Sequence, residues 1–185
     1  MPPAPAPGGR MLDNGCGIGQ ILMALDLAGV RAVGIDIDQQ ALAFGRRMAP
    51  QLGFALANGE HLPFPEHSLD LVVSRVASPY MRIPLAVPEI ARVMRPGGCI
   101  WFVLHPFSML SWSHAVGSAR RLVFEIYRVC NSASFRWQFC YPLKTSLTAY
   151  QEETGMRRCL EKNGFTQIEF TRQRHFVVTA QKSGN

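Results

Sequence analysis

The sequence lacks the long apolar run that a membrane span requires. Its longest strongly apolar segment, 99–104, has only six residues, whereas a spanning helix needs about 20. Charged residues are also sparse, at 17% of the 185 residues against 48% hydrophobic ones. Because this composition is too apolar for global disorder, length and composition together predict one globular domain without a membrane span.

Motifs built on paired cysteines are absent as well. The five cysteines lie at least ten residues apart, so the chain has no CxxC pair, which excludes zinc ribbons and thioredoxin-type redox sites. We expect no metal site, because His61, His67 and His175 have no partners at metal-ligand spacing. The cysteine pattern, and an N-terminus without the basic start and apolar stretch of a secretory signal, favour a cytoplasmic protein.

Acidic residues are scarce in the second half of the chain. Residues 93–185 hold 12 Lys or Arg and 5 Asp or Glu, whereas residues 1–92 hold 7 and 8. The excess positive charge behind the formal net charge of +6 therefore lies in 93–185. This asymmetry indicates that the second half faces something acidic.

Apolar runs alternate with segments of helical periodicity through the first hundred residues. We predict strands that end at Asp13 and that cover 31–37, 54–57, 69–75 and 99–105. The helices predicted between them run from about Ile21 to a stop at Gly29, from Asp38 to Pro50, and over 86–94. Strands joined by such helices form parallel β-α-β units, so the fold class is a doubly wound α/β sheet.

The end of the chain departs from this alternation. A helix is predicted over 148–162, followed by strands over 165–171 and 175–181. The link between these strands is too short for a crossover, so they must be antiparallel. We therefore expect a mostly parallel sheet that ends in one hairpin.

The most informative local pattern is the glycine-rich segment 12–19 (LDNGCGIG), at a strand-to-helix junction. It fails the dinucleotide pattern GxGxxG, and a phosphate loop GxxxxGK[ST] is absent. The Asp13 carboxylate also disfavours a phosphate. Asp36 follows Gly15 by 21 residues, a separation at which an acid binds ribose hydroxyls. Together these residues predict an adenosine ligand with a cationic, amino-acid-like tail.

Five motifs in order carry a family resemblance. They are DNGCGIG at 13–19, GID at 34–36, NGEHLPFP at 58–65, LDLVVS at 69–74 and EIARVMRPGG at 89–98. The series resembles class I S-adenosylmethionine-dependent methyltransferases, and within them the small-molecule group of the ubiquinone- and menaquinone-biosynthesis enzymes. The resemblance implies a seven-stranded sheet, S-adenosylmethionine as the cofactor, and methyl transfer to a small organic acceptor.

The resemblance also implies a set of cofactor-binding residues. Gly15, Gly17 and Gly19 would pass under the methionine part and Asp13 would hold its ammonium. Asp36 would bind the ribose hydroxyls, and Ile37 would lie against the adenine. Asn58 would accept the adenine amino group, where the family usually has Asp, and the backbone N–H of Gly59 or Glu60 would serve the ring nitrogens. Ser74 and Arg75 would lie close to the methyl group, and Cys16 completes the set.

No obligatory catalytic residue is predicted, because alignment of the reacting atoms is the main task in methyl transfer. If the acceptor must lose a proton, the candidates for a general base or pocket residue are His105, Tyr80 and His114. His105 ends a predicted strand, Tyr80 follows one, and His114 lies in the insertion described next.

Residues 106–147 form a cap-like insertion in a single domain at 10–182, which a flexible leader at 1–9 precedes. The insertion interleaves arginines with aromatic residues, so an RNA-directed methyltransferase or an RNA-binding module is an alternative. A nucleotide-dependent oxidoreductase is a second, less favoured alternative function.

Family members usually carry helices before the glycine loop that cover the cofactor, and we expect the insertion or a partner chain to close the site here. The sequence leaves the oligomeric state open.

Overall fold

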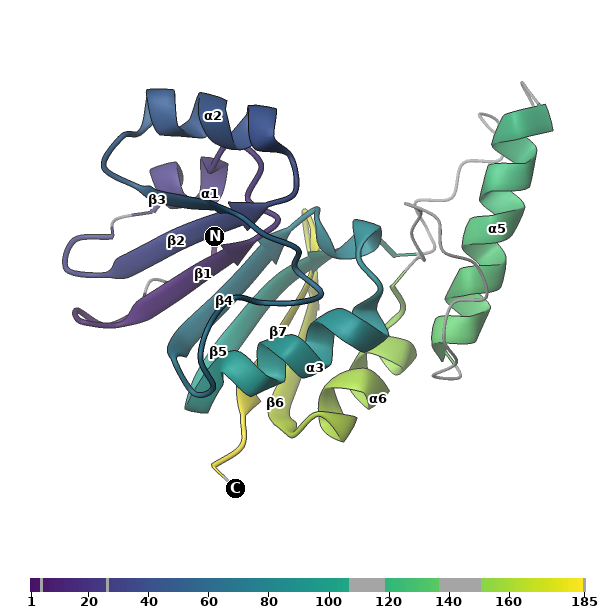
Figure 1. Ribbon diagram of the computed structural model, residues 1–185. Coiled ribbons are helices and arrows are strands. Elements are labelled where there is room, and N and C mark those ends of the chain that lie inside the picture. Colours follow the sequence, from purple (N-terminus) through teal and green to yellow (C-terminus); the bar gives the residue numbers. More distant parts are fainter. Residues whose placement is uncertain (4, 26, 107–118, 137–150, 185) are drawn as a thin grey trace.

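The computed structural model describes residues 1–3, 5–25, 27–106, 119–136 and 151–184. Its core is one seven-stranded sheet with helices on both faces (Figure 1). The strands are β1 (Arg10–Asn14), β2 (Arg31–Asp36), β3 (Gly53–Leu56), β4 (Leu69–Arg75), β5 (Met94–Leu104), β6 (Phe165–Arg172) and β7 (Phe176–Lys182). The helices are α1 (Gln20–Ala24), α2 (Gln39–Met48), the short 3-10 helix η1 (Ser78–Tyr80), α3 (Ile83–Val93), α5 (Ala119–Arg136) and α6 (Glu153–Lys162).

The strand order is β3-β2-β1-β4-β5-β7-β6. The first five strands pair in parallel, whereas β7 pairs antiparallel with both β5 and β6. This confirms the predicted doubly wound sheet with a terminal hairpin. From β1 the chain proceeds to β2 and β3 on one side and then returns to β4 on the other. The carboxyl ends of β1 and β4 therefore mark the switch point at which such sheets bind ligands.

Alternating side chains build two apolar clusters, one on each face of the sheet. In β1, Met11 belongs to one cluster and Leu12 to the other. Helices α3 and α6 cover the larger cluster, and α1 covers the smaller one on the opposite face (Figure 1). Among the described residues the larger cluster has 21 buried members and the smaller has 7. The face that carries α1 is therefore thinly covered.

Helices α1 and α6 differ from their predicted bounds. Helix α1 ends at Ala24 rather than near Gly29, because Leu25 is extended with φ −96° and ψ 145° and packs against the smaller cluster. Helix α6 begins at Glu153 rather than at 148. The backbone of Glu152 is extended, with φ −100° and ψ 153°, and Gln151 before it pairs with His105 through its backbone N–H at 2.8 Å and its side-chain oxygen at 3.0 Å.

Helix α3 and strand β5 both begin earlier than predicted. Helix α3 starts at Ile83 rather than at 86, and Pro84 is tolerated because N–H groups in the first turn have no helical partner. Strand β5 starts at Met94 rather than at 99. Met94 pairs with Leu69 before an irregularity that separates it from the longer run beginning at Cys99.

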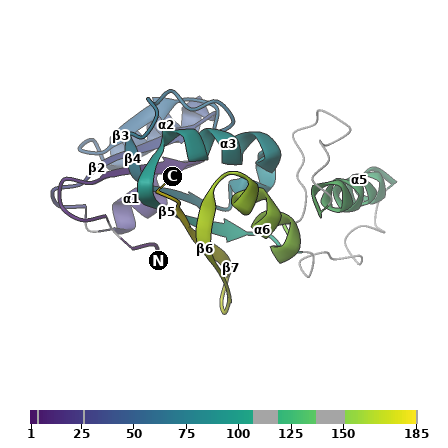
Figure 2. The same cartoon turned by 90° about the horizontal axis from the view of Figure 1, so that it is seen from below.

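The leader and the insertion lie at opposite sides of the sheet. In the leader, Gly8 N–H donates to the Gly29 carbonyl at 2.7 Å, and the Gly9 carbonyl accepts from Arg31 N–H at 2.9 Å. Helix α5 of the insertion lies beyond α6 (Figure 2). Its flanks, 107–118 and 137–150, fall outside the described residues, so a cap over the site stays a prediction. No helix in the described parts of the chain is long and apolar enough to cross a membrane.

Candidate functional site

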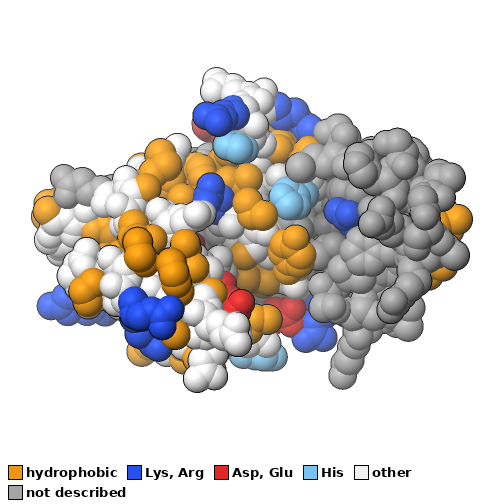
Figure 3. All heavy atoms as spheres, turned by 90° about the horizontal axis from the view of Figure 1, so that it is seen from above, with side chains coloured by type: hydrophobic (Ala, Val, Ile, Leu, Met, Phe, Trp, Pro, Cys, Tyr) orange, Lys and Arg blue, Asp and Glu red, His pale blue; other side chains and the backbone are white. Residues whose placement is uncertain are grey.

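Two adjoining cavities lie at the carboxyl ends of β1, β2 and β4. The β2 cavity, of about 430 Å³, is lined by Asn14, Gly15, Ile35, Asp36, Ile37, Ala57, Asn58, Gly59, Glu60, Ala77, Tyr80 and Met81. The loop cavity, of about 460 Å³, is lined by Asp13, Gly15, Cys16, Gly17, Ile18, Gln20, Ile21, Asp36, Arg75, Val76, Ala77 and Tyr80. Figure 3 shows this side of the molecule, with acidic side chains set between apolar ones. Both volumes are in the range of small-molecule sites.

Most of the predicted cofactor residues line these cavities. Ten do so: Asp13, Gly15, Cys16, Gly17, Asp36, Ile37, Asn58, Gly59, Glu60 and Arg75. Gly19 and Ser74 line neither. Gly19 instead packs below Phe54, whose ring lies 2.6 Å from the position that a Cβ would take. Ser74 is buried, and its hydroxyl accepts from the Ser78 hydroxyl at 3.2 Å. Gly19 therefore contributes to the packing of the glycine loop, and Ser74 to the structure at the end of β4, without facing a cavity.

The glycines of the loop serve different purposes. Gly15 has φ +78°, and a Cβ there would lie 2.1 Å from the Ala77 Cβ. Its role is therefore the close approach of two segments of the protein itself. Gly17 has φ +54°, and nothing lies within 4 Å of its Cβ position. Because Gly17 lines the loop cavity, its open side is available to a ligand.

Asp36 ties the end of β2 to the glycine loop. One carboxylate oxygen accepts from Gly17 N–H at 2.7 Å, and the other accepts from Asp38 N–H at 2.9 Å. Since a carboxylate oxygen can accept more than one hydrogen bond, both oxygens keep capacity for a ligand. Asp36 lines both cavities and so stands at their boundary.

Asp13 is a buried acid without a full set of partners. Its side chain is 1% exposed, and its Oδ2 atom has no hydrogen-bond partner. Burial raises the pKa of Asp13 from its ordinary 3.8 to about 7, while the Arg75 guanidinium lowers it and the Asp36 carboxylate raises it. Such an orphaned oxygen beside a cavity is suited to a cationic donor. The neighbouring Cys16 is unsuited to nucleophilic chemistry, because burial and these two carboxylates raise the pKa of its thiol.

Comparisons with known proteins agree with this geometry. Residues 12–102 match the family model of a methyltransferase domain. These residues belong to the methyltransferase domain family. The match begins in β1 and ends in β5, so it includes both cavities and the switch point between β1 and β4.

Curated relatives also match part of the chain, and a solved structure shares its fold. This chain is 35% identical over 91 residues to the biotin biosynthesis bifunctional protein of Cellvibrio japonicus, covering 48% of this chain and 18% of that protein. It is 33% identical over 93 residues to the malonyl-[acyl-carrier protein] O-methyltransferase of Yersinia pestis, covering 50% and 35%. A SAM-dependent methyltransferase from Methanosarcina mazei shares the fold, with TM-score 0.66, 19% identity and coverage of 98% and 95%. The chain thus spans well under two thirds of these two curated relatives.

Asn14 is a site residue that the sequence patterns did not single out. It is fully buried, lines the β2 cavity, and its Oδ1 atom has no hydrogen-bond partner. Its Nδ2 donates a long hydrogen bond of 3.5 Å to the Gly59 carbonyl. Its place directly after Asp13, at the end of the first strand, was the available signal. Ala77 and Met81 also line the cavity, but no motif marks them.

An ion pair closes one side of the β2 cavity. The Glu60 carboxylate accepts from the backbone N–H of Arg82 at 2.8 Å and from its Nε at 2.7 Å. The backbone N–H of Glu60 donates to Asn58 Oδ1 at 2.9 Å. Of the two backbone donors predicted for adenine, Glu60 N–H therefore already has a partner, and so does the Asn58 oxygen. Gly59 N–H is the donor that this arrangement leaves for a ligand.

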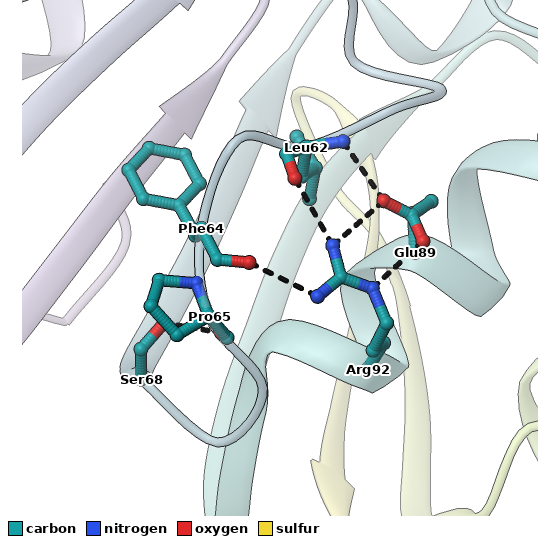
Figure 4. A network of polar contacts seen from close by, with 6 residues as sticks. All are labelled: Leu62, Phe64, Pro65, Ser68, Glu89 and Arg92. Atoms are coloured by element: carbon teal, nitrogen blue, oxygen red, sulfur yellow. Dashed lines mark hydrogen bonds and ion pairs between the residues drawn. The ribbon is translucent and has the colours of Figure 1, made fainter.

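A second network fixes the loop that carries Asn58 and Glu60 (Figure 4). Arg92 donates to the carbonyls of Leu62 and Phe64, each at 3.0 Å. It also holds Glu89, whose other hydrogen bond comes from Leu62 N–H at 2.9 Å. Hydrogen bonding from Arg92 lowers the pKa of Glu89 to about 2. This pair acts on the structure of the loop, as the sequence analysis favoured, and does not line either cavity.

The chain is strained immediately after β4. Val76 has φ +68°, a conformation that is unfavourable for a β-branched residue. It directs the chain from Arg75 into the turn that places Ala77 against Gly15. Val76 lines the loop cavity, and strained residues concentrate at functional sites.

The three catalytic candidates fall in different places. Tyr80 lines both cavities and is 64% exposed. His105 is half-buried at the end of β5 and lines neither cavity. Burial lowers the pKa of His105 below 6.5, and Arg128 of α5 lowers it further. His114 lies outside the described residues. Of the three, only Tyr80 is at the site in the described parts of the chain.

Proposed function

We propose that this chain transfers a methyl group from S-adenosylmethionine to a small organic acceptor. The observation that carries the proposal is the orphaned Asp13 oxygen beside the open side of Gly17. A buried acid at a loop that offers no phosphate-binding pattern fits the ammonium of an amino acid and disfavours a pyrophosphate. The match to the methyltransferase domain family supports the same choice.

The two cavities divide the cofactor between them. The loop cavity, with Asp13, Gly17 and Arg75, takes the methionine part. The β2 cavity takes the adenosine, with Asp36 at the ribose and Ile37, which is 76% exposed, against the adenine face. Gly59 N–H, the unpartnered Asn14 Oδ1 and the second lone pair of Asn58 Oδ1 would then serve the adenine ring.

The residues of the chain hold and orient the reactants. The bound sulfonium supplies an electrophilic methyl group whose bond to sulfur breaks with both electrons going to sulfur. Asp13 at the methionine part and Asp36 at the ribose would hold the cofactor on both sides of its sulfur, and Arg75, which lines the same cavity, would lie near the methyl group. Such orientation contributes several kcal/mol, up to about 7–11, without a catalytic base. Tyr80, at the boundary of both cavities, covers the bound cofactor.

The remaining expectations extend this proposal. We place the protein in the cytoplasm, because the described cysteines Cys16, Cys99, Cys130 and Cys159 are free thiols. The RNA-directed alternative rests on the insertion, and Arg128 is the one arginine or aromatic residue of it whose side chain the structure describes. It gains no support from the two cavities, which fit a small molecule.

Calorimetric titration tests the cofactor directly. S-adenosylhomocysteine should bind with one site per chain, whereas NAD at the same concentration should give no heat of binding. Asp36→Ala should weaken S-adenosylhomocysteine binding at least several-fold. Binding of NAD without S-adenosylhomocysteine would overturn the proposal in favour of the oxidoreductase. A screen with labelled S-adenosylmethionine over acceptor classes then measures methyl transfer itself.

A further inference from the structure

A third and larger cavity opens on the thinly covered face of the sheet. This basic groove, of about 910 Å³, is lined by Met1, Gln20, Ile21, Met23, Ala24, Arg75, Trp101, Thr171, Gln173, Arg174, His175, Val177 and Thr179. Its floor is the face of β5 and β7, and its walls are α1 and the turn between β6 and β7. Helix α1, which has only five residues, forms one wall of the groove, and Trp101 and Val177 of the smaller cluster lie at its floor.

The basic groove is continuous with the loop cavity. Gln20, Ile21 and Arg75 line both. Arg75 donates a hydrogen bond to the Gln20 side chain, so this pair stands at the junction of the two spaces. A molecule in the groove therefore reaches the place where the proposed function directs the methyl group. No other cavity described above adjoins the loop cavity from the face of β5 and β7.

The charge of the groove is of one sign. Arg75, Arg174 and His175 line it, and its lining residues include no Asp or Glu. In the described parts of the chain, no carboxylate pairs with Arg174. The neighbouring Arg172 differs, because its guanidinium lies over the Phe176 ring, 4.0 Å from the centroid, and does not line the groove. Cationic side chains at the mouth of a hollow raise the local concentration of anions.

The floor of the groove is largely apolar, with Thr179 beside Trp101 in the sheet. Trp101 is 8% exposed, Ile21 is 5% exposed, and Val177 is half-buried beside them. A purely ionic ligand gains nothing from such a surface, whereas a molecule with an apolar body and one anionic group matches both parts. This pattern of a cationic rim over an apolar floor defines the chemistry of the occupant.

We propose that the basic groove is the acceptor site and that the acceptor is an organic anion, a carboxylate or a phosphate, with an apolar body. The apolar body lies on Trp101 and Val177, and the anionic group binds Arg174. The nucleophilic atom of the acceptor is then directed toward Arg75. It forms a bond to the methyl carbon as the bond from that carbon to sulfur breaks, and any proton that the acceptor loses goes to water. This inference rests on the proposed function, of which it names the substrate class.

A matched pair of fluorescent probes tests the groove without knowledge of the natural acceptor. The anionic probe is 8-anilinonaphthalene-1-sulfonate, and its uncharged counterpart is N-phenyl-1-naphthylamine. We expect Arg174→Gln to weaken binding of the anionic probe about 5- to 10-fold and to leave the uncharged probe unchanged. Arg172→Gln, which removes the same charge from the same hairpin, should change neither. Equal effects of the two substitutions, or no loss in Arg174→Gln, would overturn the proposal.

Location and ligand class have their own readouts. Energy transfer from tryptophan to the bound anionic probe should fall in Trp101→Phe, because Trp101 lines the groove. Octanoate and octyl phosphate distinguish the two kinds of anion by which of them displaces the probe. If octanol displaces the probe at the same concentration as octanoate and octyl phosphate do, the groove is not an anion site.

The two proposals fail in different ways. If S-adenosylhomocysteine does not bind, the proposed function is wrong. Suppose that S-adenosylhomocysteine binds the original chain and Arg174→Gln with equal affinity. If the anionic probe also binds both proteins with equal affinity, the proposed function stands and only the acceptor site is wrong. In the labelled-cofactor screen, the acceptors found should be anions, and Arg174→Gln should raise their KM while kcat is retained. A neutral acceptor whose KM is unchanged in Arg174→Gln would exclude the groove as the acceptor site.

Discussion

The carboxylate of Asp36 accepts a hydrogen bond from the backbone N–H of Gly17 at 2.7 Å, and this bond joins the end of β2 to the glycine loop after β1. The second oxygen accepts from Asp38 N–H at 2.9 Å. Asp36 therefore shapes the loop before any ligand arrives. It sets the distance between the two cavities that the proposed cofactor must span.

Asp36→Asn should both destabilise the fold and weaken cofactor binding. An amide has one oxygen, so one of the two backbone donors would face an NH₂ group and lose its acceptor. We expect a loss of about 1–2 kcal/mol in unfolding free energy and a loss of about tenfold or more in affinity for S-adenosylhomocysteine. Chemical denaturation and calorimetry measure the two effects.

Asp38→Asn is the matched control. Asp38 caps α2 by accepting from the backbone N–H groups of Gln40 and Ala41 at 2.9 and 3.1 Å. Asn caps helices about as well as Asp, so this change should alter neither stability nor affinity appreciably. If both substitutions weaken binding of S-adenosylhomocysteine equally, Asp36 has no special role at the site.

Asp13 should make stability and cofactor binding respond to pH in opposite directions. Its pKa is about 7 in the folded chain and 3.8 ordinarily, so ionisation opposes folding. The penalty is absent below pH 3.8, grows between pH 3.8 and 7, and is complete above 7. Affinity for S-adenosylhomocysteine should instead rise through pH 7, because the ionised carboxylate attracts the ammonium.

Asp13→Asn separates these effects. At pH 8 the variant should unfold with a free energy about 1–3 kcal/mol higher than that of the original chain, because it buries no charge. It should bind S-adenosylhomocysteine more weakly and without the rise between pH 6 and 8. Thermal unfolding and calorimetry at pH 5, 7 and 8 provide the test. A pH dependence of binding that persists in the variant would assign the titration to another group.

The sheet could be predicted from the sequence because its signals are local. The apolar runs around Leu12, Val72 and Phe102 alternate between faces, and the short link at Gln173 permits only a hairpin. Helix ends were less predictable, because tertiary pairing decided them. Gln151 is drawn from a helical pattern into hydrogen bonds with His105, which is 46 residues away.

The sequence motifs indicated part of the candidate site. They did not indicate the residues that line it from segments without a motif. Asp13 and Asp36, which the motifs singled out, both line the loop cavity. Ala77 and Met81 have ordinary side chains, and they line the β2 cavity only because Val76 bends the chain after β4. No local pattern predicts a strained valine, since its cost is met by packing elsewhere in the fold.

Glu89 should contribute stability that is lost in acid. Its pKa is lowered from 4.5 to about 2, so the ionised form stabilises the fold. The contribution is complete above pH 4.5 and declines as the pH falls toward 2. Glu89→Gln should reduce the unfolding free energy by about 1–2 kcal/mol at pH 7 and by much less at pH 2.5. Denaturant titrations at the two pH values measure the difference, and an equal loss at both would contradict it.

Val76→Gly should stabilise the fold even though it removes a side chain. At φ +68° a valine is strained by about 1–3 kcal/mol, whereas glycine adopts this conformation freely. Glycine costs about 0.5–1 kcal/mol through the entropy of the unfolded chain, so a net gain of up to about 2 kcal/mol remains.

Ala77→Gly provides the comparison for Val76→Gly. Ala77 has φ −87° and ψ −32°, so glycine there relieves no strain, has an entropic cost and loses the packing of the Ala77 Cβ against Gly15, and this variant should be at least about 0.5–1 kcal/mol less stable. Unfolding midpoints measured in parallel should move in opposite directions. A fall in both would mean that Val76 contributes more by packing than it loses by strain.

Alanine at two glycines of the same loop should separate folding from binding. Gly15→Ala places a Cβ 2.1 Å from the Ala77 Cβ in addition to its strain at φ +78°, so it should cost at least about 2–3 kcal/mol of stability. Gly17→Ala meets no atom within 4 Å, so its cost is only the left-handed strain of about 1–2 kcal/mol. Its new methyl group, however, projects beside the loop cavity. Gly17→Ala should therefore fold and bind S-adenosylhomocysteine about tenfold or more weakly, which denaturation and calorimetry on the same preparations measure. Affinity unchanged in Gly17→Ala would mean that the methionine part does not pass over the loop.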